Sequence, residues 1–284
     1  MPSKCNNCPR RCTGKYFCSK SDQLKINLYQ LHHGEEPPIS GTKGSGTIFF
    51  SNCNLKCVFC QNYKISHLGS GHNITDAGLI KICRELEGLG AHNINFVTPT
   101  PYVDKIIPLL KTLKKDDFPL PIVWNCGGYE SLDVIKKLKG LVDIYLPDLK
   151  YSDNDLAVRY SSAPGYFENA IEVIKEMRHQ VKDVFDKGVM KSGLIIRHLV
   201  LPSNIENTKG VLKAIRASIG KDVFVSLMSQ YYPVHNACNY PEIDHKLKPS
   251  EYDEVCDYFA ELGFEDGFVQ ELDSASSEYT PDFV

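Results

Sequence analysis

The chain has 284 residues, of which 42% are hydrophobic and 24% are charged, and its formal net charge is −3. This length suits one large α/β domain or two smaller ones, and the small charge gives no overall attraction to nucleic acid or anionic lipid. No apolar run approaches the ~20 residues that a bilayer span needs, and the first residues lack the apolar core of a signal peptide. We therefore expect a cytoplasmic protein without a membrane partner, for which nucleic acid is a disfavoured partner.

Residues 1–45 predict an irregular N-terminal extension that is rich in cysteine. Four cysteines fall within its first eighteen residues, followed by the loop HHGEEPPISGTKGSG, which is rich in Gly, Pro and Ser. Without a signal peptide, metal ligation explains clustered thiols better than disulfides do. The spacing C-x2-C-P-x2-C-x5-C supplies enough thiolates for either a zinc ion or a complete iron–sulfur cluster, and we favour a second [4Fe–4S] cluster over zinc. These ligands are Cys5, Cys8, Cys12 and Cys18.

From residue 46 to residue 284 the pattern becomes regular, with short apolar runs separated by segments of helical periodicity. One such segment places Leu79, Ile82, Cys83, Leu86 and Leu89 on one face, and Gly90 can end that helix. Near the C-terminus, Ser250 and Asp253 predict a capping box, and Gly263 is the stop signal. Apolar runs that alternate with helices indicate parallel strands covered on both faces, in either a doubly wound sheet or a barrel. The predicted strands lie in residues 47–53, 93–99, 120–126, 141–150, 193–202 and 222–229.

A second cysteine group, C-x3-C-x2-C, directly follows the first predicted strand. Three thiolates can bind three irons of a [4Fe–4S] cube and leave the fourth iron open. Structural zinc needs four ligands, and it commonly uses pairs of C-x2-C, so this spacing favours the cluster. We predict Cys53, Cys57 and Cys60 as its ligands, and we assign no catalytic residue beyond them.

The segment GTIFFSNCNLKCVFCQN, together with NINFVTPTPYV, IVWNCGGYE, VDIYLPDLKY and IIRHLVLP, resembles the pyruvate formate-lyase activating enzyme group of radical S-adenosylmethionine (SAM) proteins. The resemblance covers most of the chain, especially to shorter homologues with a Cys-rich N-terminal segment. It implies an incomplete (β/α)6 TIM-like barrel, with the cluster and SAM at the carboxyl ends of the strands. It also implies that SAM is cleaved to a 5′-deoxyadenosyl radical, which abstracts hydrogen from a substrate.

Charged side chains at two predicted strand ends match the SAM site of that family. Asp148 and Lys150 follow the fourth strand, and Arg197 lies in the fifth. A guanidinium suits a carboxylate bidentately, and strand ends are where barrel enzymes place their sites. The alternative for all three residues is a structural ion pair. The neighbouring His198 should face the opposite side of its strand and serve packing.

The resemblance implies four further SAM contacts. Phe59 matches an aromatic that helps to position adenine, although it could also shield the cluster from water. Thr98 and Thr100 replace the family's GGEP motif, and a tight turn is their alternative role. Asn125 stands where the family has an Asp near a bound cation, so a cation site is in doubt here.

We therefore predict a radical SAM enzyme reduced by an electron donor such as a flavodoxin or ferredoxin. Its substrate could be a peptide, a glycyl radical protein or a small molecule, because fold-level analogy does not carry substrate identity. Two rivals stay open: an RNA-modifying radical SAM enzyme, and a non-catalytic protein with two iron–sulfur or zinc centres.

Overall fold

We describe a computed structural model of the chain that covers residues 4–20, 22–276 and 281–283. All six predicted strands are confirmed, and hydrogen bonds join them as parallel neighbours. A short seventh strand, β10 (Gly267–Val269), continues the parallel series after β9. The six strands are β2 (Ser45–Phe50), β4 (Ile94–Val97), β5 (Ile122–Cys126), β6 (Ile144–Pro147), β8 (Val189–Leu199) and β9 (Phe224–Met228).

The sheet has an open order, β10-β9-β8-β6-β5-β4-β2-β1-β3, so the barrel is incomplete, as predicted. Besides β10, three further strands were not predicted. β1 (Leu24–His32) pairs antiparallel with β2, β3 (His72–Ile74) pairs with β1, and β7 (Val184–Asp186) forms a hairpin with β8. The predicted irregular extension of residues 1–45 is irregular only in its described part from residue 4 to residue 20. Its remainder contains β1 and a short helix before β2. The domain boundary between residues 45 and 46 stays a prediction. β1 lies before this boundary and pairs with β2, most of which lies after it.

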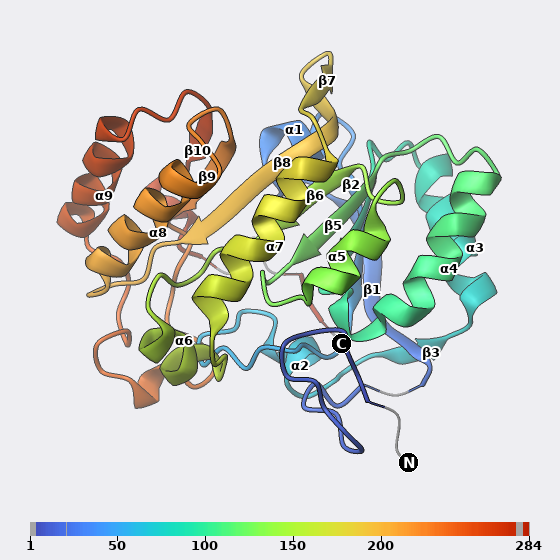
Figure 1. Cartoon of the computed structure of the whole chain (residues 1–284), viewed down its shortest axis with the longest axis horizontal. Helices are drawn as coiled ribbons and strands as arrows, with labels where there is room; N and C mark the ends of the chain where they lie inside the picture. The colour runs from blue at the N-terminus through green and yellow to red at the C-terminus, as the bar shows by residue number, and fades with distance from the viewer. Residues whose placement is uncertain (1–3, 21, 277–280, 284) are drawn as a thin grey trace.

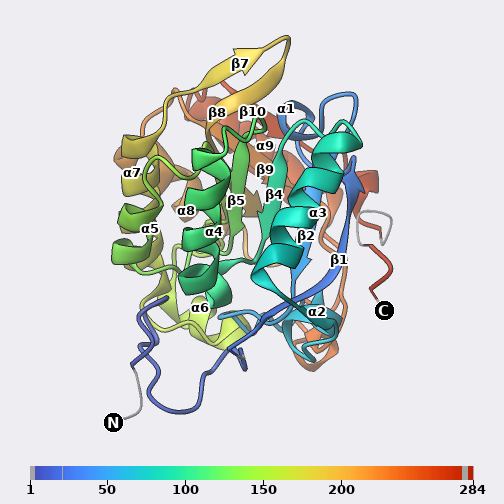
Figure 2. The same cartoon turned by 90° about the vertical axis from the view of Figure 1, so that its right-hand side faces the viewer.

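Helices alternate with the strands and cover the outer face of the sheet (Figures 1 and 2). The helix predicted from the Leu79 face is confirmed, but Leu89 is 63% exposed because the chain leaves the helix there. The last helix begins earlier than predicted: the Lys248 N–H donates to Glu251 at 3.0 Å, so Ser250 and Asp253 do not form the capping box. The main helices are α3 (Asp76–Gly88), α4 (Val103–Lys115), α5 (Leu132–Leu138), α6 (Asn154–Ser161), α7 (Tyr166–Gln180), α8 (Ile205–Ser218) and α9 (Pro249–Glu261).

The remaining helical segments are short. They are α1 (Pro37–Ser40), α2 (Tyr63–Ser66) and the 3-10 turns Thr100–Tyr102, Ala237–Asn239 and Leu272–Ser274. No helix among the described residues is long and apolar enough to cross a membrane.

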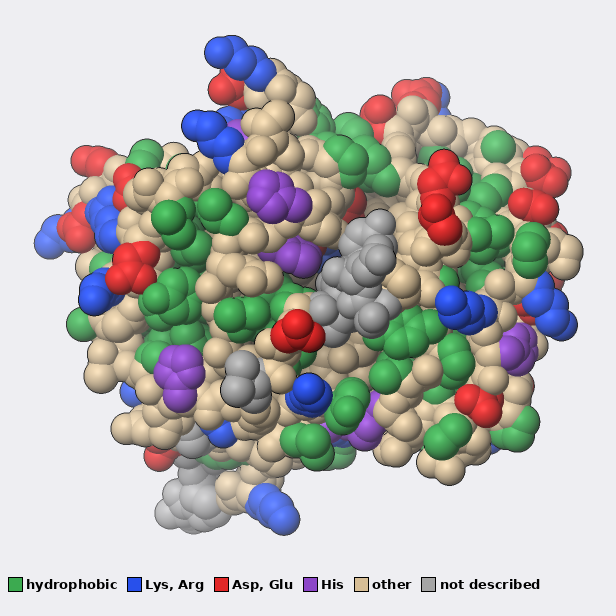
Figure 3. Space-filling model, turned by 180° about the vertical axis from the view of Figure 1, so that it is seen from behind, with side chains coloured by type: hydrophobic (Ala, Val, Ile, Leu, Met, Phe, Trp, Pro, Cys, Tyr) green, Lys and Arg blue, Asp and Glu red, His purple; other side chains and the backbone are tan. Residues whose placement is uncertain are grey.

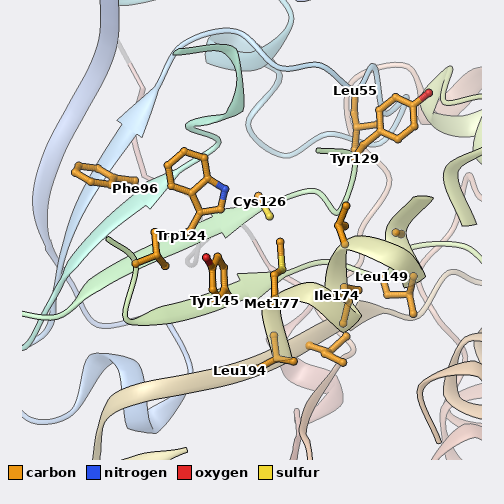
Figure 4. Packing of buried hydrophobic residues seen from close by; sticks show 14 of the residues in the cluster. Leu55, Phe96, Trp124, Cys126, Tyr129, Tyr145, Leu149, Ile174, Met177 and Leu194 are labelled. Atoms are coloured by element: carbon orange, nitrogen blue, oxygen red, sulfur yellow. The ribbon is translucent and has the colours of Figure 1, made fainter. Parts of the chain in front are cut away.

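Alternate strand residues face two different layers, which explains the continuous apolar runs. Trp124 and Tyr145 pack among the helices (Figure 4), whereas Val123, Ile144 and Leu146 face the barrel interior. A strand buried on both faces needs apolar residues at every position. The interior positions nearer the carboxyl ends of the strands are more polar, and they form the site described below.

The C-terminal tail returns to the barrel. Phe283 packs edge-on against Phe49, with ring centroids 5.4 Å apart, and the cluster also includes Ile65 and Val97. Residues 277–280 of this predicted tail lie outside the described residues.

Candidate active site

The barrel interior encloses a cavity of about 770 Å³, which lies in the upper part of the range of roughly 300–1,000 Å³ for small-molecule sites. The structure brings the three predicted cluster ligands to its wall together with six of the seven predicted SAM contacts. Figure 3 shows the molecule from behind, where histidine, acidic, basic and hydrophobic side chains all lie near the middle of the face. Residues from sequence-distant strands therefore meet in one site. The predicted residues on this wall are Cys53, Cys57, Cys60, Phe59, Thr98, Asn125, Asp148, Lys150 and Arg197.

The cysteine loop follows β2 and is held from several sides. Asn52 adopts φ 72°, and its amide donates to the Tyr102 hydroxyl at 2.8 Å. The N–H groups of Lys56 and Val58 donate to carbonyls at the end of α6, at 3.0 and 2.8 Å. A short loop fastened at both ends gives its cysteines fixed positions, as a cluster site requires.

Each cysteine sulfur of the loop has a polar partner. The Leu55 N–H donates to Cys53 at 3.4 Å, the Ser161 hydroxyl donates to Cys57 at 3.0 Å, and Ser66 Oγ lies 3.1 Å from Cys60. Burial and then the neighbouring thiol raise the pKa of Cys60 to about 11. Such thiols are not thiolates at neutral pH without a positively charged partner, and iron provides one.

The donor set suits a cluster better than a single ion. Among the described residues, no three His, Cys, Asp or Glu side chains converge as ligands of one metal ion. A [4Fe–4S] cube does not require such convergence, because each cysteine binds a different iron. Three thiols on the wall of one cavity would hold three irons of such a cube and leave its fourth iron open to a ligand.

Asp148 and Lys150 form an ion pair beside the thiols, with 2.6 Å between Asp148 Oδ2 and Lys150 Nζ. Their side chains are 26% and 18% exposed, so both reach the cavity. Burial lowers the pKa of Lys150, but Asp148 and the thiols outweigh burial and hold that pKa above its usual value. Lys150 is therefore a permanent cation at this wall, available to a ligand carboxylate.

Arg197 reaches the cavity, but its guanidinium already binds two carboxylates. Nε and Nη2 donate to Glu36 at 2.7 and 2.6 Å, and Nη2 also contacts Glu35. The three side chains are 12% exposed or less. The alternative role of Arg197, a structural ion pair, is thus present. Glu36 occupies the Nε–Nη2 edge of the guanidinium, through which Arg197 could otherwise bind a ligand carboxylate bidentately. His198 faces the other way, as predicted, and contacts the Leu149 carbonyl and the Thr208 hydroxyl at 2.7 and 2.9 Å.

Phe59, Thr98 and Asn125 line the cavity as predicted. Phe59 is 6% exposed and packs edge-on against the buried Tyr231, with centroids 5.7 Å apart. Thr98 has φ 58°, and its N–H donates to the Asn125 carbonyl at 2.9 Å. A β-branched residue in this region is strained by about 1–3 kcal/mol, and such strain clusters at functional sites.

Thr100, the seventh predicted SAM contact, does not line this cavity. It is 1% exposed, and its hydroxyl donates at 2.6 Å to Glu130, a carboxyl that is fully buried. The reason is local: the turn after Thr98 carries Thr100 behind the wall, next to the N-terminal cysteines. Within the described part of the chain, Glu130 Oε2 has no hydrogen-bond partner, and burial raises the pKa of this carboxyl.

The four N-terminal cysteines line one small pocket. The Cys5 N–H donates to the Cys12 carbonyl at 2.8 Å, which brings these two residues side by side, and Cys8 and Cys18 are buried. Burial raises the pKa of Cys8 to about 11. Asn54, next to Cys53, lines the same pocket.

Several lining residues were not predicted. Glu35 and Glu36 come from the loop that precedes α1, and His32 and His33 from the end of β1. The composition of this stretch predicts only a loop rich in Gly, Pro and Ser. The paired acids were the available signal, because two adjacent carboxylates in a loop of such composition suggest a fixed polar role.

The profile of the Radical SAM superfamily matches residues 47–201, more than half of the chain. The chain belongs to the radical SAM superfamily. It is also 33% identical over 268 residues to the uncharacterized protein MJ0674 of Methanocaldococcus jannaschii, a match that covers 88% of this chain and 72% of that protein. Membership implies a [4Fe–4S] cluster and SAM, in agreement with the three cysteines of the loop.

Solved structures of other proteins share the fold at low sequence identity. Streptococcus suis SuiB bound to SAM has a TM-score of 0.54 and 15% identity, and the match covers 79% of this chain and 50% of SuiB. Methylornithine synthase PylB has a TM-score of 0.51 and 15% identity, with 74% and 59% covered. The chain thus spans about half the length of these proteins, and the likeness shows the partial barrel alone.

Proposed function

We propose that the protein is an enzyme in which Cys53, Cys57 and Cys60 hold a [4Fe–4S] cluster beside a SAM site. The observation that carries this function is the meeting of three thiols, one buried and two partly buried, with the Asp148–Lys150 pair on one cavity wall. Together, the bound cluster and SAM supply one-electron cleavage of SAM to a 5′-deoxyadenosyl radical.

The chain's own residues bind and orient SAM. Lys150 offers an ammonium to the SAM carboxylate, and Asp148 offers an acceptor to the SAM amino group. Phe59 excludes water from the thiols. Thr98 and Asn125 add polar groups where β4 and β5 end.

The test is anaerobic reconstitution followed by measurement of iron and of 5′-deoxyadenosine formed with dithionite. Wild type should bind about four irons at this site, and the Cys53→Ala, Cys57→Ala, Cys60→Ala variant should lose them and all SAM cleavage. Cys238→Ala with Cys256→Ala is the matched control, because neither residue lines the cavity. Cleavage that persists in the triple variant would sink the assignment.

For the substrate, we favour a peptide or protein segment, as the likeness to the pyruvate formate-lyase activating group implies. Among the described residues, β10 and β3 do not pair, so strand pairing does not close the barrel. SuiB, one of the structural neighbours, is known bound to a precursor peptide. Deuterium transfer from an α-deuterated glycine peptide into 5′-deoxyadenosine would support this substrate class. Transfer only from a small metabolite or an RNA base would exclude it.

We also propose a second metal centre at the four N-terminal cysteines, with a [4Fe–4S] cluster preferred to zinc. Two of these thiols are buried within a segment that has no helix or strand, and a metal would stabilise such a segment.

A further inference from the structure

The described segment 4–20, here called the basic segment, combines the four cysteines with an unusual charge. It contains five cationic side chains and no Asp or Glu, on a chain whose net charge is −3. Positive charge of this density creates a local attractive field for an acidic partner. The cations are Lys4, Arg10, Arg11, Lys15 and Lys20.

Most of this charge faces solvent. Lys4, Arg11 and Lys15 are exposed, whereas Lys20 is paired with Asp104 at 3.5 Å. In Figures 1 and 2 the segment lies at the end of the molecule where α2 and α6 also lie, opposite the β7 hairpin. The cysteine loop that precedes α2 is at this same end.

The basic segment is joined directly to the cluster loop. Arg10 Nε donates to the Asn54 carbonyl at 2.8 Å. Asn54 lines the pocket of the N-terminal cysteines, and its Oδ1 lies 3.9 Å from Cys53 Sγ. One residue thus separates the two cysteine groups, so an electron that arrives at the segment has a short path to Cys53.

We propose that the basic segment is the docking site of an acidic one-electron carrier protein, whose electron enters the enzyme there. This inference rests on the proposed function, since it assumes a cluster at Cys53. In the step, the carrier is oxidised by one electron and the cluster is reduced by one, and no bond forms or breaks. Charge complementarity at such a surface speeds encounter and makes binding sensitive to salt.

An RNA partner fits this surface less well. Binding of single-stranded RNA relies on exposed aromatic faces on which bases stack. Phe17 is 37% exposed, but the Arg10 guanidinium covers its ring at 3.4 Å from the centroid. The ring face is therefore occupied, and charge is the feature that remains for recognition.

The test compares two charge-reversal variants of the reconstituted holoenzyme with reduced acidic flavodoxin as the probe. Arg11→Glu with Lys15→Glu changes the basic segment, and Lys182→Glu with Lys187→Glu is the control near the β7 hairpin, where both lysines are exposed. The first variant should weaken flavodoxin binding at low ionic strength roughly tenfold and lower flavodoxin-driven SAM cleavage to match. Dithionite-driven cleavage and iron content should equal wild type, and the control should change nothing.

Unchanged flavodoxin affinity in the first variant would overturn the proposal. So would a loss of affinity only for a single-stranded RNA oligonucleotide, and so would an equal fall of dithionite-driven and flavodoxin-driven cleavage. Failure of wild type with dithionite would instead reject the proposed function. Flavodoxin binding, measured without turnover, would still decide whether the basic segment is a docking site.

Discussion

Replacing Arg197 by Ala separates its two candidate roles, as a SAM contact and as the partner of Glu35 and Glu36. The substitution leaves two carboxylates without a cation, and their side chains are only 7% and 6% exposed. Breaking a buried ion pair from one side costs about 3–5 kcal/mol. For a chain of this size that cost corresponds to a melting temperature roughly 6–20 °C lower.

The pH dependence of this loss follows from Glu36. Burial raises the pKa of this carboxyl, but Arg197 outweighs burial and holds the pKa below the usual 4.5. A lowered carboxyl pKa contributes stability that is present above the unfolded value and is lost as pH falls through the folded value. Without Arg197, burial alone should raise the pKa. The difference in melting temperature between wild type and variant should therefore shrink as pH falls from 7 toward about 4.5.

Anaerobic thermal melts across that pH range, together with SAM binding at a temperature where both proteins are folded, measure the two roles. Replacing Glu35, Glu36 and Arg197 together by Gln should restore most of the lost stability, because no unpaired charge is then buried. Arg159→Ala is the control: its pair with Glu242 is 52% and 33% exposed and is screened by solvent, so its loss should leave the melting temperature close to that of wild type. An Arg197→Ala protein that melts like wild type but loses SAM affinity would refute the structural role.

Three further outcomes test the rest of the site. Lys150→Met should weaken SAM binding by about 1.5–3 kcal/mol with iron content unchanged, and unaltered affinity would leave Lys150 only an ion-pair partner. Glu130→Gln should gain stability relative to wild type as pH rises above about 4.5 in thermal melts, because the raised pKa of buried Glu130 makes its ionisation destabilising; a gap independent of pH would contradict this. Replacing the four N-terminal cysteines by Ala should lower iron from about eight to about four, whereas one bound zinc and four irons in wild type would indicate a zinc site. The residues are Cys5, Cys8, Cys12 and Cys18.

The strands that could be predicted are those with a strong local pattern. β5 and β6 are buried on both faces, so every residue is apolar or nearly so, and the pattern is visible without tertiary information. β1 is only partly buried: Leu24 and Ile26 are buried, and its other residues are partly or fully exposed. β3, β7 and β10 have three residues each, too few to show a period. Their pairing depends on neighbours that are distant in sequence.

The candidate site shows the same division. Residues at the carboxyl ends of strands, such as Asn125 and Asp148, lie on one cavity wall because parallel strands end at one edge of the sheet. Thr100 was misplaced because one 3-10 turn is enough to redirect a side chain. Glu36 was missed because its role depends on Arg197, 161 positions away, and no local pattern encodes that contact.

The charges of the cavity also bear on which ligand it favours. With histidine counted as neutral, its ionisable lining residues sum to a net charge of −2 before any thiolate is counted. SAM carries a sulfonium and an ammonium group against one carboxylate, so it brings net positive charge into this lining. Lys150 then supplies the local cation for the carboxylate, while the acidic excess favours the rest of the ligand. An anionic ligand of similar size would meet the opposite balance. The residues counted are Glu35, Glu36, Asp148, Glu271, Lys150 and Arg197.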